Sequence, residues 1–137
     1  MPETPEGFAP LNRTSPYLAL VGPLFQKARP GRTLQVGMRI EARHANHAGA
    51  AHIGILCLLA DIAMGYATAL STEPPTPVGT VNLSLDFVST AKVGDWIESE
   101  VEVVRVGRRL AFASCYLLVE GRRVARASTA LNVVAQT

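Results

Sequence analysis

The sequence predicts an α+β domain in which one long helix precedes an antiparallel sheet. Residues 53–71 contain many good helix formers, are apolar nearly all round and lack strict alternation, which indicates a helix buried on most sides. Three runs after this helix are strand-like and largely alternate apolar with polar residues, which is typical of half-buried strands. The 137 residues fit one domain and are enough to bury a real core.

The first part of the chain predicts an arm and a short helix. Residues 1–15 are polar and rich in proline, so we expect a flexible N-terminal arm ahead of a single domain over residues 16–137. Ser15 offers a helix N-cap and Pro16 suits the first helical position. A short helix is therefore predicted over Tyr17–Val21.

A strand, a loop and the long helix follow. The alternation over residues 33–43 predicts a half-buried strand, and residues 44–51, which are glycine, alanine, histidine and asparagine, are predicted to form a loop. The helix over residues 53–71 ends where the sequence STEPPTPVG breaks the chain. The apolar face of the first strand consists of Leu34, Val36, Met38, Ile40 and Ala42.

The later strands form a meander. Residues 96–106 and 110–119 are predicted to pair through a hairpin turn at Gly107–Arg109, and Glu120-Gly121 starts a final strand that ends near Val134. The strand over residues 80–89 is expected to place on one face Val81, Leu83, Leu85 and Phe87, and on the other Asn82, Ser84 and Asp86.

The composition favours a cytoplasmic oligomer. With 48% hydrophobic and 18% charged residues, the domain is expected to hide apolar surface in an interface between copies. A net charge of +2 does not suggest a nucleic-acid partner, and Asp61 splits the longest apolar run, so no membrane span is expected. The acidic, proline-rich start does not fit a signal peptide. Cys57 and Cys115 lie in apolar segments and are interpreted as buried hydrophobes in a reducing compartment.

The loop and the helix together carry a specific motif. The pattern Asn46-x-x-Gly49-x-x-His52-Ile53-Gly54, with Asp61 nine residues after the histidine, resembles the Asn-x-x-Gly-x-x-His-Gly-Gly signature of the PaaI-like (phenylacetate-pathway type) hotdog thioesterases. The later sequence VGTVNLSLDFVSTAKVGD also resembles that family, with a hydroxyl residue at Thr80, and the likeness covers roughly residues 33–135. The resemblance implies the hotdog fold, a curved antiparallel sheet around one central helix, and acyl-CoA thioesterase activity without a cofactor.

One residue departs from the family pattern. Ile53 stands where the family has a glycine whose backbone N–H polarises the thioester carbonyl. Isoleucine keeps the N–H, but its branched side chain could narrow the acyl pocket, and it forbids the positive φ that glycine permits.

Thioester hydrolysis requires hydrogen-bond donors at the carbonyl oxygen and a carboxylate that attacks or activates water. The start of the long helix at Ile53 and Gly54 offers free N–H groups, and Asn46 can add its side-chain amide. Asp61 supplies the carboxylate, and its place in an apolar run is expected to make it a better base than a solvated aspartate. By resemblance, Thr80 would orient the attacking water.

One chain cannot complete this site. Eight residues of helix separate Ile53 from Asp61, which is about 12 Å at 1.5 Å per residue. Two helices packed antiparallel about a twofold axis would bring Asp61 of one subunit to the helix start of the other, and the resemblance implies the same arrangement. We therefore expect a dimer, or a dimer of dimers (a homotetramer), with the active site at the dimer interface.

The residue pattern is compatible with several alternatives. Asp61 could lie on a solvent face or pair with an arginine, and His52 could either brace the loop or take part in the chemistry. A metal site at the loop histidines is disfavoured, because His-x-x-His on a flexible loop is weak evidence. Five arginines gather around two neighbouring turns and either bind the phosphates of coenzyme A or form solvated charge: Arg105, Arg108, Arg109, Arg122 and Arg123.

Two further functions compete with the acyl-CoA thioesterase. A non-catalytic acyl-CoA or lipid-binding hotdog protein is conceivable because of Ile53. A hotdog hydratase or dehydratase fits less well, because those enzymes use a different pattern of aspartate and histidine. Hydrolysis of a panel of acyl-CoAs would distinguish the thioesterase from the other two functions.

Overall fold

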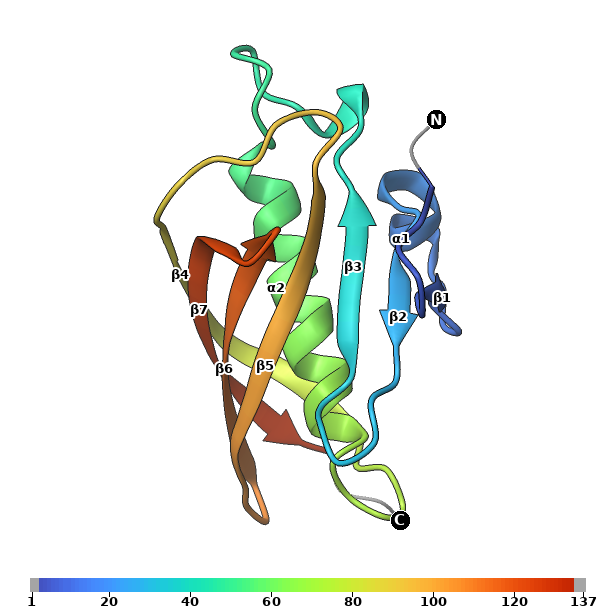
Figure 1. The fold of residues 1–137 in the computed structure, drawn as a ribbon. Helices are drawn as coiled ribbons and strands as arrows, with labels where there is room; N and C mark the ends of the chain where they lie inside the picture. Colours follow the sequence, from blue (N-terminus) through green and yellow to red (C-terminus); the bar gives the residue numbers. More distant parts are fainter. Residues whose placement is uncertain (1–2, 135–137) are drawn as a thin grey trace.

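A seven-stranded antiparallel sheet curves around the long helix α2, which runs from Ile53 to Ala69 (Figure 1). The computed structural model describes residues 3–134. The strand order β1-β2-β3-β5-β6-β7-β4 confirms the α+β architecture of a curved sheet around one central helix. The strands are β1 (Ala9–Pro10), β2 (Phe25–Lys27), β3 (Gln35–Arg39), β4 (Val78–Phe87), β5 (Trp96–Val106), β6 (Leu110–Val119) and β7 (Arg122–Val133).

The short helix α1 spans Pro16–Val21, as its cap residues predict. The Ser15 hydroxyl accepts a hydrogen bond from the Leu18 N–H at 3.2 Å. The strand expected over residues 33–43 is shorter, because residues 42–44 turn into a 3₁₀ helix, η1 (Ala42–His44).

Helix α2 divides into two faces along its length. One face is buried against the sheet and consists of Ile55, Leu56, Leu59, Ala60, Ala63, Met64, Ala67 and Thr68. The opposite face, here called the outer face of α2, is half-buried or exposed and consists of Ile53, Gly54, Cys57, Leu58, Asp61, Ile62, Gly65, Tyr66, Ala69 and Leu70. Asp61 is the one charged side chain on a face that is otherwise almost entirely apolar, so the structure leaves this face without a full cover.

The N-terminal segment lies against the sheet, where a loose arm had been expected. β1 pairs with β2, and β2 pairs with β3. The Phe8 ring meets the Trp96 indole edge-on with centroids 5.0 Å apart. A Cβ on Gly37 would lie 2.5 Å from that indole, so only glycine allows Trp96 to cover β3. β3 is consequently buried on both faces rather than half-buried.

A bulge in β4 changes which side chains face the helix. The register of β4 against β7 shifts between Thr80 and Asn82, so Val81 is an extra residue and is 63% exposed. Leu83 and Leu85 pack against the core, as expected. Simple alternation places Thr80 on the opposite face with Asn82, but the bulge turns Thr80 towards α2.

Candidate active site

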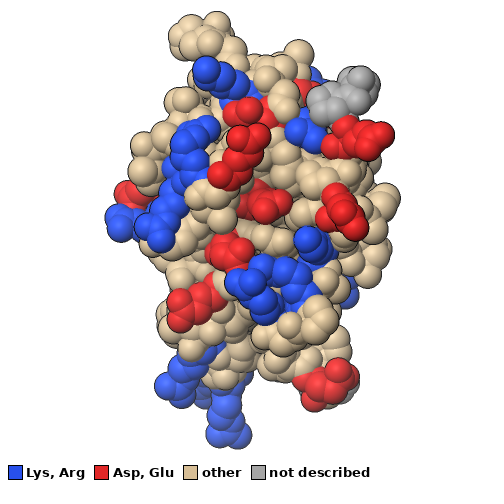
Figure 2. Space-filling view, viewed as in Figure 1, with Lys and Arg blue, Asp and Glu red and all other residues tan. Residues whose placement is uncertain are grey.

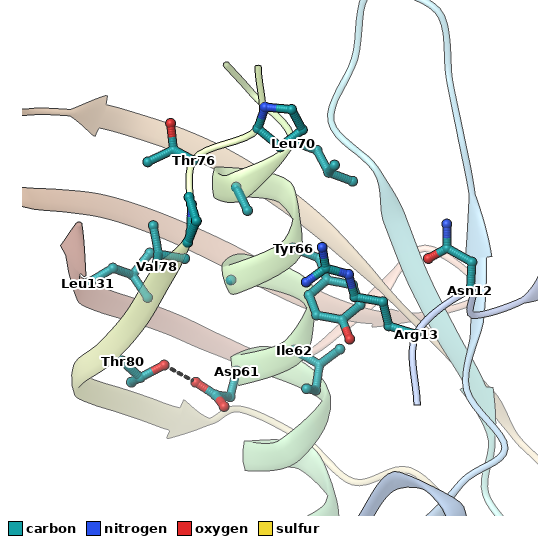
Figure 3. Close-up of a pocket in the computed structure, with 14 residues that line it drawn as sticks. Asn12, Arg13, Asp61, Ile62, Tyr66, Leu70, Thr76, Val78, Thr80 and Leu131 are labelled. Atoms are coloured by element: carbon teal, nitrogen blue, oxygen red, sulfur yellow. Dashed lines mark hydrogen bonds between the residues drawn. The ribbon is translucent and has the colours of Figure 1, made fainter. Parts of the chain in front are cut away.

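Asp61 and Thr80 form the polar centre of a pocket on the outer face of α2 (Figure 3). The Thr80 hydroxyl donates a hydrogen bond to Asp61 Oδ1 at 2.6 Å. The cavity has a volume of about 410 Å³, and most of its other walls are apolar and come from the second half of α2, the segment 75–78 and Leu131; Asn12 and Arg13 of the N-terminal segment also line it. Within residues 3–134, Asp61 forms no ion pair, so the alternative of an arginine-bound structural carboxylate finds no partner there.

The Asn46 side chain closes the loop that precedes α2. Its Oδ1 accepts hydrogen bonds from the N–H groups of Ala48 at 2.9 Å and Ala50 at 3.1 Å. Gly49 within this loop has φ +81°, a conformation that favours glycine. Because the oxygen is held by two backbone donors, the Asn46 amide NH₂ points elsewhere, and no residue in the described part of the chain accepts its protons.

His52 is the N-cap of α2. Its Nδ1 accepts a hydrogen bond from the Gly54 N–H at 2.8 Å, so this N–H is already occupied. The Ile53 N–H has no acceptor among the described residues and stands at the positive end of the helix, with a side chain that is 54% exposed. The structure thus leaves the Ile53 N–H free to polarise a carbonyl and gives His52 a capping contact.

We expect His52→Ala to lower the free energy of unfolding by about 1 kcal/mol, the usual cost of losing an N-cap. His52→Asn, which supplies another good cap, should restore the stability and keep the hydrolysis rate. Denaturant unfolding and steady-state kinetics on both variants measure this. A His52→Asn protein that is stable but inactive would assign the imidazole a direct role in the chemistry.

The loop histidines do not converge on Asp61. His44 is buried, with Nδ1 accepting from the Glu41 N–H at 2.9 Å and Nε2 bonded to the Val21 carbonyl. His44 is therefore occupied as a structural residue, whereas His47 is exposed. No cluster of three metal-ligating side chains occurs within residues 3–134.

The five arginines do not form one cluster, contrary to their expected gathering. The turns at 107–109 and 120–121 lie at opposite ends of β6, about 30 Å apart for a ten-residue strand. Arg122 lies near the start of α2 and donates to the Ser89 hydroxyl and the Thr90 carbonyl. Consecutive hairpin turns of an antiparallel sheet alternate between its ends, which explains the separation.

The β5–β6 turn lies beside the pocket that holds Asp61. The Val133 N–H donates to the Arg109 carbonyl, and the Val134 N–H donates to the carbonyl of Pro77, a wall of that pocket. Blue side chains project at the lower end of Figure 2, where Figure 1 places this turn. The three exposed arginines there are Arg105, Arg108 and Arg109.

The thiols are not candidates for the nucleophile. Both cysteines are free, and burial raises the pKa of the Cys115 thiol to about 12. Burial also raises the pKa of Cys57, which lies one helical turn before Asp61. Both thiols therefore stay protonated at neutral pH and lack the thiolate that nucleophilic attack requires.

Two pocket residues were not singled out from the sequence. Arg13 and Tyr66 line the same cavity as Asp61, with the Arg13 guanidinium carbon 5.9 Å from the centroid of the Tyr66 ring. Tyr66 follows Asp61 by five positions, a spacing that does not by itself put two helical residues on one face, so the sequence carried no direct signal for it. Nothing in the proline-rich start indicated that Arg13 reaches the helix.

No helix within residues 3–134 has the length and apolar character needed to cross a membrane.

Comparisons with known proteins agree on one family. The family model described as the thioesterase superfamily matches residues 48–125. The chain is 51% identical over 128 residues to the Pseudomonas aeruginosa protein PA0474, whose name assigns it provisionally to the esterases; the match covers 93% of this chain and 96% of that one. It is 33% identical over 87 residues to human acyl-coenzyme A thioesterase 13, covering 64% and 61% of the two chains.

The fold has close counterparts among solved structures. The PaaI protein from the phenylacetic acid degradation operon of Escherichia coli superimposes with a TM-score of 0.79 at 18% identity, over 90% of this chain and 87% of that one. The curved sheet, the central helix and these matches define a hotdog-fold thioester hydrolase. More specifically, the chain belongs to the thioesterase superfamily.

Proposed function

We propose that this hydrolase cleaves acyl-CoA thioesters into the free acid and coenzyme A, in a site shared by two subunits. The observation that carries the proposal is the Asp61 carboxylate, bonded to Thr80 in a largely apolar pocket and eight helical residues away from the unoccupied Ile53 N–H. The similarity to human acyl-coenzyme A thioesterase 13 supports the substrate class.

The chain's own residues suggest the chemical steps. The thioester carbonyl oxygen accepts hydrogen bonds from the Ile53 N–H and the Asn46 amide, which stabilise the negative charge that develops there. Asp61 either attacks the carbonyl carbon directly or takes a proton from a water that attacks it. The Thr80 hydroxyl orients the carboxylate or that water. The C–S bond then breaks, the sulfur leaves as coenzyme A thiol, and water supplies the oxygen of the free acid.

The shared site follows from two uncovered surfaces. The outer face of α2 is apolar except near Asp61, and Gly54, which has no side chain, would let a second helix approach closely at the start of α2. In the described residues, β4 is also one of the two edge strands of the sheet, with one side unpaired. A second copy related by a twofold axis would cover both surfaces and bring its helix start to Asp61.

Coenzyme A is expected to lie across the β5–β6 turn. Within residues 3–134, Arg105, Arg108 and Arg109 form no ion pair and lie beside the segment 75–78 of the pocket wall. Guanidinium groups bind phosphate oxygens through paired N–H donors, so this turn suits the phosphates of the nucleotide. Gly54, without a side chain, keeps the helix start open to the substrate.

The test of this function is a panel of acyl-CoAs that differ in chain length and aromatic character, with release of coenzyme A measured. Hydrolysis of at least one member is expected. Binding of acyl-CoA in the absence of any hydrolysis would instead identify a non-catalytic acyl-CoA-binding protein.

We expect Asn46→Asp to lower turnover by about 10²-fold or more, the scale for losing one donor at a developing oxyanion. Aspartate can still accept the two loop hydrogen bonds, so the melting temperature should hold. Asn46→Ala removes the donor and the loop bonds together and should lower both turnover and stability. Unchanged turnover in Asn46→Asp would restrict Asn46 to a structural role in the loop.

A further inference from the structure

The pocket that holds Asp61 receives two polar side chains from the N-terminal segment, Asn12 and Arg13. Figure 3 shows the Arg13 guanidinium lying against the Tyr66 ring, on the side of the pocket away from Thr80. The guanidinium carbon is 5.9 Å from the ring centroid. Stacking on an aromatic face leaves the in-plane N–H donors of an arginine available to a ligand.

No acidic residue within residues 3–134 pairs with Arg13, whereas four other arginines form ion pairs. The Tyr66 hydroxyl and the Asn12 side-chain amide likewise have no hydrogen-bond partner in the described part of the chain. Three groups that can donate hydrogen bonds therefore lie along one side of an otherwise largely apolar cavity. Such an arrangement suits a ligand group that carries negative charge and acceptor oxygens.

The position of these donors suits the far end of an acyl group. Tyr66 follows Asp61 by five residues, which is about 7.5 Å along the helix axis. With coenzyme A on the side of the segment 75–78, the side of the pocket along Ile62 towards Tyr66 and Arg13 is left for the acyl group (Figure 3). The far end of a short or medium acyl chain would then reach the donors.

We propose that Arg13, together with Tyr66 and Asn12, binds a carboxylate at the distal end of the acyl group, so that the preferred substrates are monothioesters of dicarboxylic acids. This inference rests on the proposed function and specifies its substrate class. Arg13 lies outside residues 48–125, the part that the thioesterase superfamily model matches. The N-terminal segment of this chain thus adds specificity to a catalytic core contributed by the fold.

A binding experiment separates this inference from catalysis. Adipyl-CoA and hexanoyl-CoA have the same chain length and differ in the distal carboxylate. With the Asp61→Asn protein, which should bind without hydrolysing, titration calorimetry should show adipyl-CoA binding about tenfold more tightly, the scale of one charge-assisted pair. In the Asp61→Asn background, Arg13→Gln should abolish the preference for adipyl-CoA. Arg13→Lys in the same background keeps the positive charge and should retain part of that preference.

A second variant controls for the possibility that Arg13→Gln detaches the N-terminal segment from α2. Tyr66→Phe keeps the ring beneath Arg13 and removes only the hydroxyl, so it should reduce the adipyl preference by less than Arg13→Gln does. In the protein with Asp61 intact, Arg13→Gln should lower the ratio of kcat/KM for adipyl-CoA to kcat/KM for hexanoyl-CoA by about tenfold. The change should come from a higher KM for adipyl-CoA, with kcat little altered.

Equal affinity of the Asp61→Asn protein for the two thioesters would overturn the inference. An equal loss of affinity for both thioesters in Arg13→Gln, absent with N-acetylcysteamine thioesters that lack the nucleotide, would also overturn it and assign Arg13 to the phosphates of coenzyme A. Failure of the unaltered protein to hydrolyse any acyl-CoA is a separate outcome that would overturn the proposed function.

Discussion

The Asp61→Asn variant is expected to hydrolyse acyl-CoA about 10⁴-fold more slowly than the unaltered protein, the scale on which losing a reacting side chain lowers turnover. The amide cannot attack the carbonyl or accept a proton from water. Its oxygen can still accept the Thr80 hydrogen bond, which is 2.6 Å long in the structure. The folded state should therefore persist while the chemistry is lost.

The stability of this variant tests the alternative of a structural carboxylate. If Asp61 were held by an arginine, Asp61→Asn would leave that arginine unpaired and lower the melting temperature. The structure shows a carboxylate on an apolar face with no ion pair in residues 3–134, so the melting temperature should hold or rise.

The matched control is Asp86→Asn, the same chemical change at an exposed position of β4. Asp86 pairs with Arg126 at 2.8 Å on the exposed face, away from the pocket. We expect little change in hydrolysis and little change in stability, because exposed ion pairs contribute weakly. A destabilised Asp61→Asn protein that kept most of its hydrolysis rate would contradict the mechanism.

Local rules predicted the elements that position the site. The apolar run with one aspartate predicted helix α2 to within two residues, and Ser15 and Pro16 predicted the start of α1. The spacing from Asn46 to Asp61 predicted a loop, a helix start and a carboxylate two turns along it. Each of these depends on residues near one another in the sequence.

Long-range packing decided what the sequence could not show. Alternation placed Thr80 with Asn82, and only the bulge at Val81, set by pairing with β7, turns its hydroxyl to Asp61. β2 was not predicted, because three residues carry too little pattern. The N-terminal segment is positioned by Trp96, 88 positions after Phe8, and that contact brings its polar residues near the pocket.

The second large effect concerns the Ile53 N–H. Ile53→Pro deletes this one donor and should lower turnover by about 10²- to 10³-fold. Proline suits the first position of a helix, and His52 already has the extended backbone, φ −63° and ψ 142°, that a following proline requires. Ile53→Gly is the control because it keeps the N–H. It should stay active and accept bulkier acyl groups; loss of its activity with the fold intact would contradict the role of Ile53 as a pocket wall.

Dimers that pair one Ile53→Pro chain with one Asp61→Asn chain test whether the site is shared. If Asp61 of one subunit works with the helix start of the other, a mixed dimer has one site with both defects and one site with neither. Mixed dimers, obtained by coexpression with two different affinity tags and tandem purification, should therefore recover about half the activity of the unaltered dimer, since a twofold axis generates two equivalent sites. Each variant alone should stay nearly inactive, and light scattering should show dimers or larger even-numbered assemblies. Mixed dimers as inactive as their parents, or a fully active monomer, would place Asp61 and its donors within one chain and end the shared-site mechanism.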